Sequence, residues 1–137
     1  MPRTRVSESF LFVYGTLRRD SDHPMARFLA RHARFVETAD FQGRLFIVAD
    51  YPGAVPSDDP RDRVRGDVFE LRRPAWLLRK LDEYEGCRPL ERTPAYVRAL
   101  RPVTLTSGEQ RNAWIYLFNR PTRHLQHVVS GDFYAHD

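Results

Sequence analysis

The chain has 137 residues, of which 42% are hydrophobic and 29% charged, and these proportions are typical of one soluble globular domain. A single cysteine, Cys87, excludes an internal disulfide framework and a cysteine-paired zinc site. The longest strongly apolar run, Phe10–Val13, is far shorter than the roughly 18 residues of a membrane-spanning helix. Because the sequence also shows no secretory cleavage pattern, we expect a cytoplasmic protein without a membrane partner.

The net charge of +4 and the pI of about 9.6 would suit a partner that carries phosphates. All but one of the 22 basic residues are arginines, the exception being Lys80, and they are interleaved with acids, as in the stretch 59–63. The sequence contains no basic run of the roughly 5–8 residues that mark a polyanion-binding tract. We therefore expect no nucleic-acid partner and interpret the charge as a mixed, solvated surface.

The first half of the chain predicts strands around one helix. Residues 1–9 are polar and are expected to form a loose tail. The apolar run at 10–14 ends at Gly15 and predicts a buried strand. Pro24 begins a helix whose apolar residues follow helical spacing. Strands are expected at 35–39 and 43–49, and the Pro-Gly pair within 51–56 predicts a turn.

The second half of the chain predicts three further strands and a second helix. A strand is expected at 64–71, and Pro74 begins a helix with a broad apolar stripe that Gly86 would cap. Strands at 96–105 and 112–118 are joined by a hairpin-like turn at 107–109. The segment from Pro121 onward is ambiguous, a helical turn being one option. Six strands and two short helices predict a small, mostly β, α+β domain over residues 10–137, and a closed or partly closed barrel would leave the fewest free edges.

Most motifs that indicate a cofactor are absent from the sequence. It contains no dinucleotide fingerprint, phosphate loop, nucleophile elbow or His-Glu-x-x-His motif. His124 and His127, with Asp132 and His136 nearby, would permit a metal site, but their spacing is weak evidence and surface histidines are the simpler interpretation. Cys87 has no neighbour in sequence that would act as its base. We therefore expect neither a metal nor a cofactor.

The loop after the first strand is the first candidate site. Its residues are Tyr14, Gly15, Thr16, Leu17 and Arg18. Gly15 would permit a sharp turn and a close approach of a ligand to the main chain. Successive N–H groups in such a turn can cradle a carboxylate, which Arg18 would help to attract. An ordinary strand-to-loop turn is the alternative.

The end of the second helix is the other candidate site. Asp82, Glu83 and Glu85 lie where the helix macrodipole disfavours negative charge. Neighbouring charge, and burial where it occurs, would raise the pKa of one carboxyl group, which could then accept and return a proton near neutral pH. Asp82 and Glu83 are expected to be solvated. Glu85 precedes Gly86, where the chain turns, and is the candidate for acid–base catalysis.

Together these segments resemble the gamma-glutamylcyclotransferase-like family, including the gamma-glutamylamine cyclotransferases. The resemblance rests on residues 14–18 and 81–86, with supporting pieces at 51–54, 64–69 and 96–98, and it covers residues 10–118 in the family's order. One departure is Asp20, where relatives often carry a glycine after the basic pair.

The resemblance implies a six-stranded barrel with flanking helices and a cavity beside the first loop. It also implies roles for particular residues: the backbone of Tyr14, Gly15, Thr16 and Leu17 holds the amino-acid end of the substrate, and Glu85 is the general acid/base. The implied reaction is cyclisation of a γ-glutamyl amide or peptide, which releases 5-oxoproline and a free amine. Since the substrate supplies its own nucleophile, the protein chiefly has to hold the reactive conformer and move one proton.

The expected partner is therefore a small γ-glutamyl molecule, and the expected state is a monomer or weak homodimer. Two alternatives belong to other classes of protein. One is a binding module that keeps the pocket without catalysis, and the other is nucleic-acid binding through the arginines. Tyr96 and Tyr116 either line the cavity or, as is commoner for tyrosines in strands, pack in the barrel.

Overall fold

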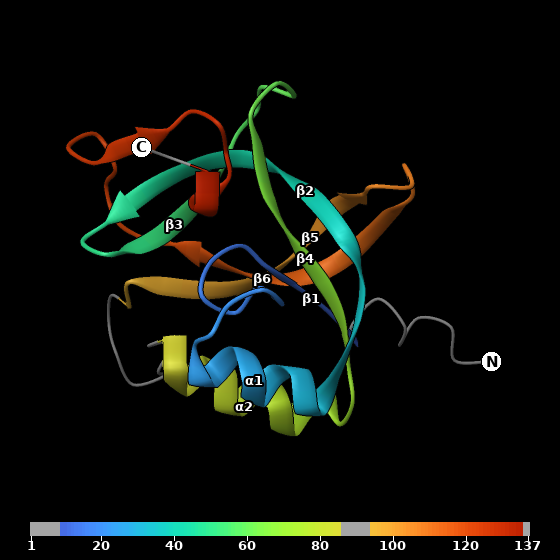
Figure 1. Cartoon of the computed structure of the whole chain (residues 1–137). Coiled ribbons are helices and arrows are strands. Elements are labelled where there is room, and N and C mark those ends of the chain that lie inside the picture. The colour runs from blue at the N-terminus through green and yellow to red at the C-terminus, as the bar shows by residue number, and fades with distance from the viewer. Residues whose placement is uncertain (1–8, 86–93, 136–137) are drawn as a thin grey trace.

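The computed structural model describes residues 9–85 and 94–135 (Figure 1). Neither helix in these ranges is long and apolar enough to cross a membrane. The elements are, in chain order, β1 (Phe10–Val13), α1 (Pro24–His32), β2 (Ala33–Val48), β3 (Tyr51–Pro56), β4 (Arg63–Leu71), α2 (Pro74–Glu85), β5 (Tyr96–Leu105), β6 (Gln110–Phe118), β7 (Gln126–Val128) and the 3-10 helix η3 (Phe133–Ala135).

Five of the strands close into a mixed barrel. Their neighbour order is β1–β4–β2–β3–β6, and β6 returns to β1 where Leu11 lies opposite Trp114. The two pairings of β6 within the ring, with β1 and β3, are parallel, and the others are antiparallel. Outside the ring, β5 pairs with β6 and β2, and β7 pairs with β2. The predicted α+β barrel with two short helices is thus confirmed, although the described residues contain seven strands rather than six.

The largest error of the sequence prediction concerns β2 and β3. The expected break between residues 39 and 43 does not exist, because Asp40, Phe41 and Gln42 continue the pairing with β4 and Phe41 is buried. The predicted turn at 51–56 is instead strand β3, paired with β2 along its whole length. The chain turns earlier, where Ala49 adopts a φ of 56°.

The C-terminal segment, left ambiguous by the sequence, forms β7 and η3. The helical turn η3 follows Gly131 and Asp132. Three features named in the sequence prediction, the Gly86 cap, Cys87 and His136, lie outside the described residues, as do residues 1–8 of the expected tail 1–9.

Strand β1 separates two hydrophobic cores and thereby positions the loop that follows it. Phe10, Phe12 and Tyr14 face the barrel interior, whereas Leu11 and Val13 face a second core that both helices cover. Figure 1 shows α1 and α2 together at one end of the barrel. Because side chains alternate along a strand, β1 is buried on both faces and ends between the barrel and the helices.

One glycine of β4 allows β1 to lie close to it. A Cβ on Gly66 would stand 2.3 Å from the carbonyl oxygen of Val13 and 2.7 Å from Cζ of Phe12. The oxygen belongs to the backbone and cannot move without disturbing the β1–β4 pairing. We therefore expect Gly66→Ala to lower the free energy of unfolding by at least about 2 kcal/mol, measured by chemical denaturation.

Gly108→Ala is the matched control for this prediction. Nothing lies within 4 Å of a Cβ at Gly108, and only its φ of +97° opposes the substitution. The expected cost there is about 1–2 kcal/mol of backbone strain. A Gly66→Ala protein as stable as the wild type would show that β1 does not approach β4 as closely as described.

Candidate active site

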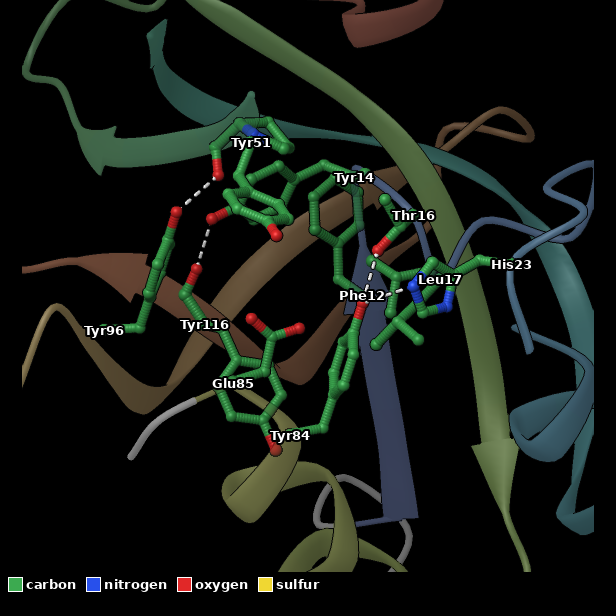
Figure 2. Close-up of a pocket in the computed structure, with 13 residues that line it drawn as sticks. Phe12, Tyr14, Thr16, Leu17, His23, Tyr51, Tyr84, Glu85, Tyr96 and Tyr116 are labelled. Atoms are coloured by element: carbon green, nitrogen blue, oxygen red, sulfur yellow. Dashed lines mark hydrogen bonds between the residues drawn. The ribbon is translucent and has the colours of Figure 1, made fainter. Parts of the chain in front are cut away.

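A cavity of about 360 Å³ opens where the end of β1, the start of β3 and the end of α2 meet (Figure 2). Both candidate segments border it, although they are far apart in sequence: Tyr14, Gly15, Thr16 and Leu17 line one side, and Glu85 lines another. The rest of the wall is mainly aromatic. Its further tyrosines are Tyr51, Tyr84, Tyr96 and Tyr116.

Gly15 also permits a close contact that the sequence did not predict. It does not adopt a positive φ, which among the described glycines belongs to Gly108 and Gly131. A Cβ at Gly15 would instead stand 2.5 Å from Cγ of Pro52 in β3, so the glycine permits close packing of the loop on that ring. The Arg18 N–H donates to the Gly15 carbonyl at 3.0 Å and closes the turn.

The loop also presents free hydrogen-bond donors. Within residues 9–85 and 94–135, the backbone N–H groups of Gly15, Thr16 and Leu17 have no hydrogen-bond partner. Buried N–H groups are nearly always paired in proteins, so three consecutive free donors beside a cavity are available to a ligand. Such donors suit a carboxylate or a developing oxyanion.

The Glu85 carboxyl group faces the centre of the cavity (Figure 2). It has no hydrogen-bond or ion-pair partner among the described residues. Burial, and secondly the negative charge of Asp82, raise the pKa of Glu85 to about 7. At neutral pH this group therefore exists in both protonation states, as a general acid/base requires.

Asp82 is not the solvated residue that the sequence predicted. Its carboxylate accepts hydrogen bonds from Arg98 Nε at 2.8 Å, from Arg98 Nη2 at 3.1 Å and from the Tyr116 hydroxyl at 2.7 Å. The guanidinium of Arg98 lies 4.5 Å from the ring centroid of Trp114. Asp82 thus links α2 to β5 and β6 by hydrogen bonds, one helical turn before Glu85. Glu83 is exposed, as expected.

Tyr96 and Tyr116 both line the cavity, with their hydroxyl groups bonded to the protein. The Tyr96 hydroxyl donates to the Pro52 carbonyl at 2.9 Å, and the Tyr116 hydroxyl donates to Asp82. Tyr14 donates to the Tyr116 carbonyl and accepts from the Ala54 N–H at 3.1 Å. Burial raises the pKa of Tyr96 and of Tyr116, so both stay protonated and present mainly ring surface to the cavity.

Arg18 has another role than the expected attraction of a carboxylate ligand. Its Nη1 lies 2.8 Å from Asp132 and its Nε 3.9 Å from the buried Asp67. The Tyr134 hydroxyl donates to the Gly15 carbonyl at 3.1 Å. Arg18 therefore fastens the C-terminal segment to the loop. In the described part of the chain, His124, His127 and Asp132 do not form a three-residue cluster that could hold a metal ion.

Sequence reasoning missed His23, Tyr51 and Tyr84, which also line the cavity. Tyr84 adjoins Glu85 in the helix, and that proximity was the available signal. His23 immediately precedes the predicted helix start at Pro24, but histidine is not among the residues that favour the N-cap position. Tyr51 lies in the segment for which the sequence predicts a turn, and such a turn gives no reason to place it beside the site.

The fold and the cavity together define a class: mixed β-barrels in which a loop after the first strand and a carboxyl group at a helix end border one site. The family model described as gamma-glutamyl cyclotransferase, AIG2-like, matches residues 11–135, and the chain belongs to this family. The match includes β7 and η3, beyond the part of the chain on which the resemblance rested. Family membership supports an enzyme of the gamma-glutamyl cyclotransferase type.

Solved structures share the fold. The chain is 27% identical to YkqA from Bacillus subtilis, with a TM-score of 0.67. This match covers 90% of the present chain but only 39% of YkqA. It is 28% identical to ytfP from Escherichia coli, with a TM-score of 0.57 and coverage of 90% and 94%. An AIG2-like protein from Mus musculus is 23% identical, with a TM-score of 0.62. This match covers 80% of the present chain and 76% of the mouse protein. The comparison with curated proteins finds no match.

Proposed function

We propose that this protein cyclises γ-glutamyl amides or peptides to 5-oxoproline and a free amine, with Glu85 as the general acid and base. One observation carries the proposal: a carboxyl group with a pKa of about 7 faces the same cavity as three free N–H groups. The cavity volume of about 360 Å³ lies in the range of small-molecule sites.

The proposed binding mode follows from what each wall offers. The N–H groups of Gly15, Thr16 and Leu17 would hold the α-carboxylate of the γ-glutamyl group. The aromatic rings would enclose its carbon chain and keep water away. With the carboxylate at the loop, the α-amino group would lie on the side of Glu85, which has no described partner of its own.

The chemistry then needs one proton carrier. Ionised Glu85 takes a proton from the α-ammonium group, and the freed amine attacks the γ-carbonyl carbon to close a five-membered ring. The electron pair moves to the carbonyl oxygen. When the C=O bond re-forms, the bond to the leaving nitrogen breaks, and protonated Glu85 returns its proton to that nitrogen. The ring nitrogen still carries one proton more than the product lactam, and Glu85 passes that proton to the released amine, which leaves as an ammonium ion. No water is consumed, and Glu85 ends ionised as it began.

Holding the folded conformer supplies much of the rate enhancement. The attack is intramolecular, and effective concentrations of about 10⁵ M or more are known for well-oriented groups. A pKa of about 7 suits Glu85 for both proton transfers, because neither protonation state is strongly disfavoured at neutral pH.

The proposal is tested by incubating the protein with a panel of γ-glutamyl amines, amino acids and the γ-glutamyl-ε-lysine isopeptide. We expect 5-oxoproline and the amine to appear in equal amounts for at least one of them. Thermal protection by these compounds without any turnover would contradict the proposal and favour the non-catalytic binding module.

A further inference from the structure

Three cavity-lining side chains from separate segments form a hydrogen-bonded chain. The Tyr84 hydroxyl, on α2, lies 2.9 Å from Oγ1 of Thr16 in the loop and 3.3 Å from Nε2 of His23. The rings of His23 and Tyr84 meet edge to face, with centroids 5.4 Å apart. Figure 2 shows the three side chains connected along one wall of the cavity, with Glu85 on the neighbouring wall.

The N-cap of α1 determines which groups donate and which accept in this series of hydrogen bonds. His23 is the N-cap residue, and its Nδ1 accepts the Met25 N–H at 3.0 Å. A ring nitrogen that accepts carries no proton, so a neutral His23 carries its proton on Nε2. Nε2–H is therefore the donor to the Tyr84 oxygen.

The same reasoning assigns the next proton. Because the Tyr84 oxygen accepts from His23, its own O–H is free to donate to the other neighbour, Oγ1 of Thr16. Thr16 then acts as acceptor toward Tyr84, and its hydroxyl proton has no acceptor among the described residues. Thr16 is only partly buried and lines the cavity, so this donor is available to a ligand there.

We propose that the Thr16 hydroxyl donates a hydrogen bond to the α-carboxylate of the bound γ-glutamyl group, and that His23 and Tyr84 orient it. The identity of the ligand rests on the proposed function. A hydroxyl donor adjoins the three free N–H groups, and together they form a carboxylate-binding site without a basic side chain. Thr16 binds the substrate in this scheme, while Tyr84 and His23 are positioning residues.

Two substitutions at Thr16 separate the hydroxyl from the shape of the side chain. Thr16→Val keeps the shape and removes the donor, and we expect KM to rise about tenfold, since a hydrogen bond to a charged group is lost. Loss of a bond made equally in the ground and transition states leaves kcat and the pH profile nearly unaltered. Thr16→Ser retains the hydroxyl and is expected to recover most of the lost affinity. Equal KM values for the Val and Ser variants would overturn the proposal.

Two further substitutions test the orientation. Tyr84→Phe removes both hydrogen bonds of the tyrosine. His23→Asn removes Nε2–H together with the ring contact to Tyr84, while asparagine, a good N-cap residue, preserves the start of α1. We expect each to raise KM by about threefold, less than Thr16→Val, because the Thr16 hydroxyl remains but is no longer held in one orientation. Wild-type KM in both variants would refute the orienting roles.

One measurement requires no turnover. Nuclear magnetic resonance on isotope-labelled histidine should show His23 with its proton on Nε2, and a proton on Nδ1 would overturn the inference. If the wild type releases no 5-oxoproline, the proposed function fails by itself. Calorimetric binding of L-glutamate and 5-oxoproline to the wild type and Thr16→Val then decides the inference: weaker binding by the variant supports it, and equal or absent binding contradicts it.

Discussion

Glu85→Gln lowers kcat/KM for 5-oxoproline release by about 10²–10⁴-fold, the range that positioned general acids and bases contribute. Glutamine has nearly the same size and shape, so the cavity and the loop remain intact. It cannot accept the ammonium proton or return one to the leaving nitrogen. The measurement is the initial rate of 5-oxoproline release for the best substrate of the panel.

Glu83→Gln is the matched control for this prediction. Glu83 lies in the same turn of α2 but is exposed, so removal of its charge should change kcat/KM by less than about twofold. If Glu85→Gln retained more than a tenth of the wild-type rate, another group would have to carry the proton.

The pH dependence of kcat/KM follows from the raised pKa of Glu85. The reaction needs the ionised carboxylate, and burial together with the charge of Asp82 raises the pKa of Glu85 to about 7. Activity should therefore fall tenfold per pH unit below about pH 7, which leaves about 1% of the plateau at pH 5. A rate that stays on its plateau down to pH 5 would indicate a base with an ordinary carboxyl pKa and contradict this assignment.

The same pKa predicts an effect on stability. Because the folded-state pKa of Glu85 lies above the usual 4.5, stability is lost as pH rises from about 4.5 to 7. Glu85→Gln abolishes this loss. At pH 8 the variant should be more stable than the wild type by about 3 kcal/mol, and near pH 4 the two should be equal. Denaturant titrations at both pH values measure the difference, and equal stability at pH 8 would show that the carboxylate is well solvated.

The sequence could predict the local parts of the site. The loop from Tyr14 to Leu17 follows a short apolar strand, and Glu85 ends an amphipathic helix, so both are recognisable from neighbouring residues alone. That they border one cavity depends on how β1 and α2 pack, and only the family resemblance predicted it. The roles of these residues in binding and catalysis stay predictions.

Interactions between segments that are distant in sequence explain why the sequence did not predict the environment of Asp82 or the strand β3. Asp82 looked like a solvated helix-end charge because its partners, Arg98 and Tyr116, belong to β5 and β6. The pair Pro52-Gly53 looked like a turn because its composition favours one. In the fold it lies in β3, where a Cβ on Gly53 would stand 2.9 Å from the Val48 side chain, so glycine serves packing there.

The origin of the product oxygen atoms tests the central claim most directly. The protein is incubated with its best γ-glutamyl amide in water enriched in the heavy oxygen isotope, and the products are analysed by mass spectrometry. Intramolecular cyclisation consumes no water, so we predict 5-oxoproline without the heavy isotope, together with one equivalent of amine. Glutamate that carries the heavy isotope would show that water is the nucleophile and would contradict the account.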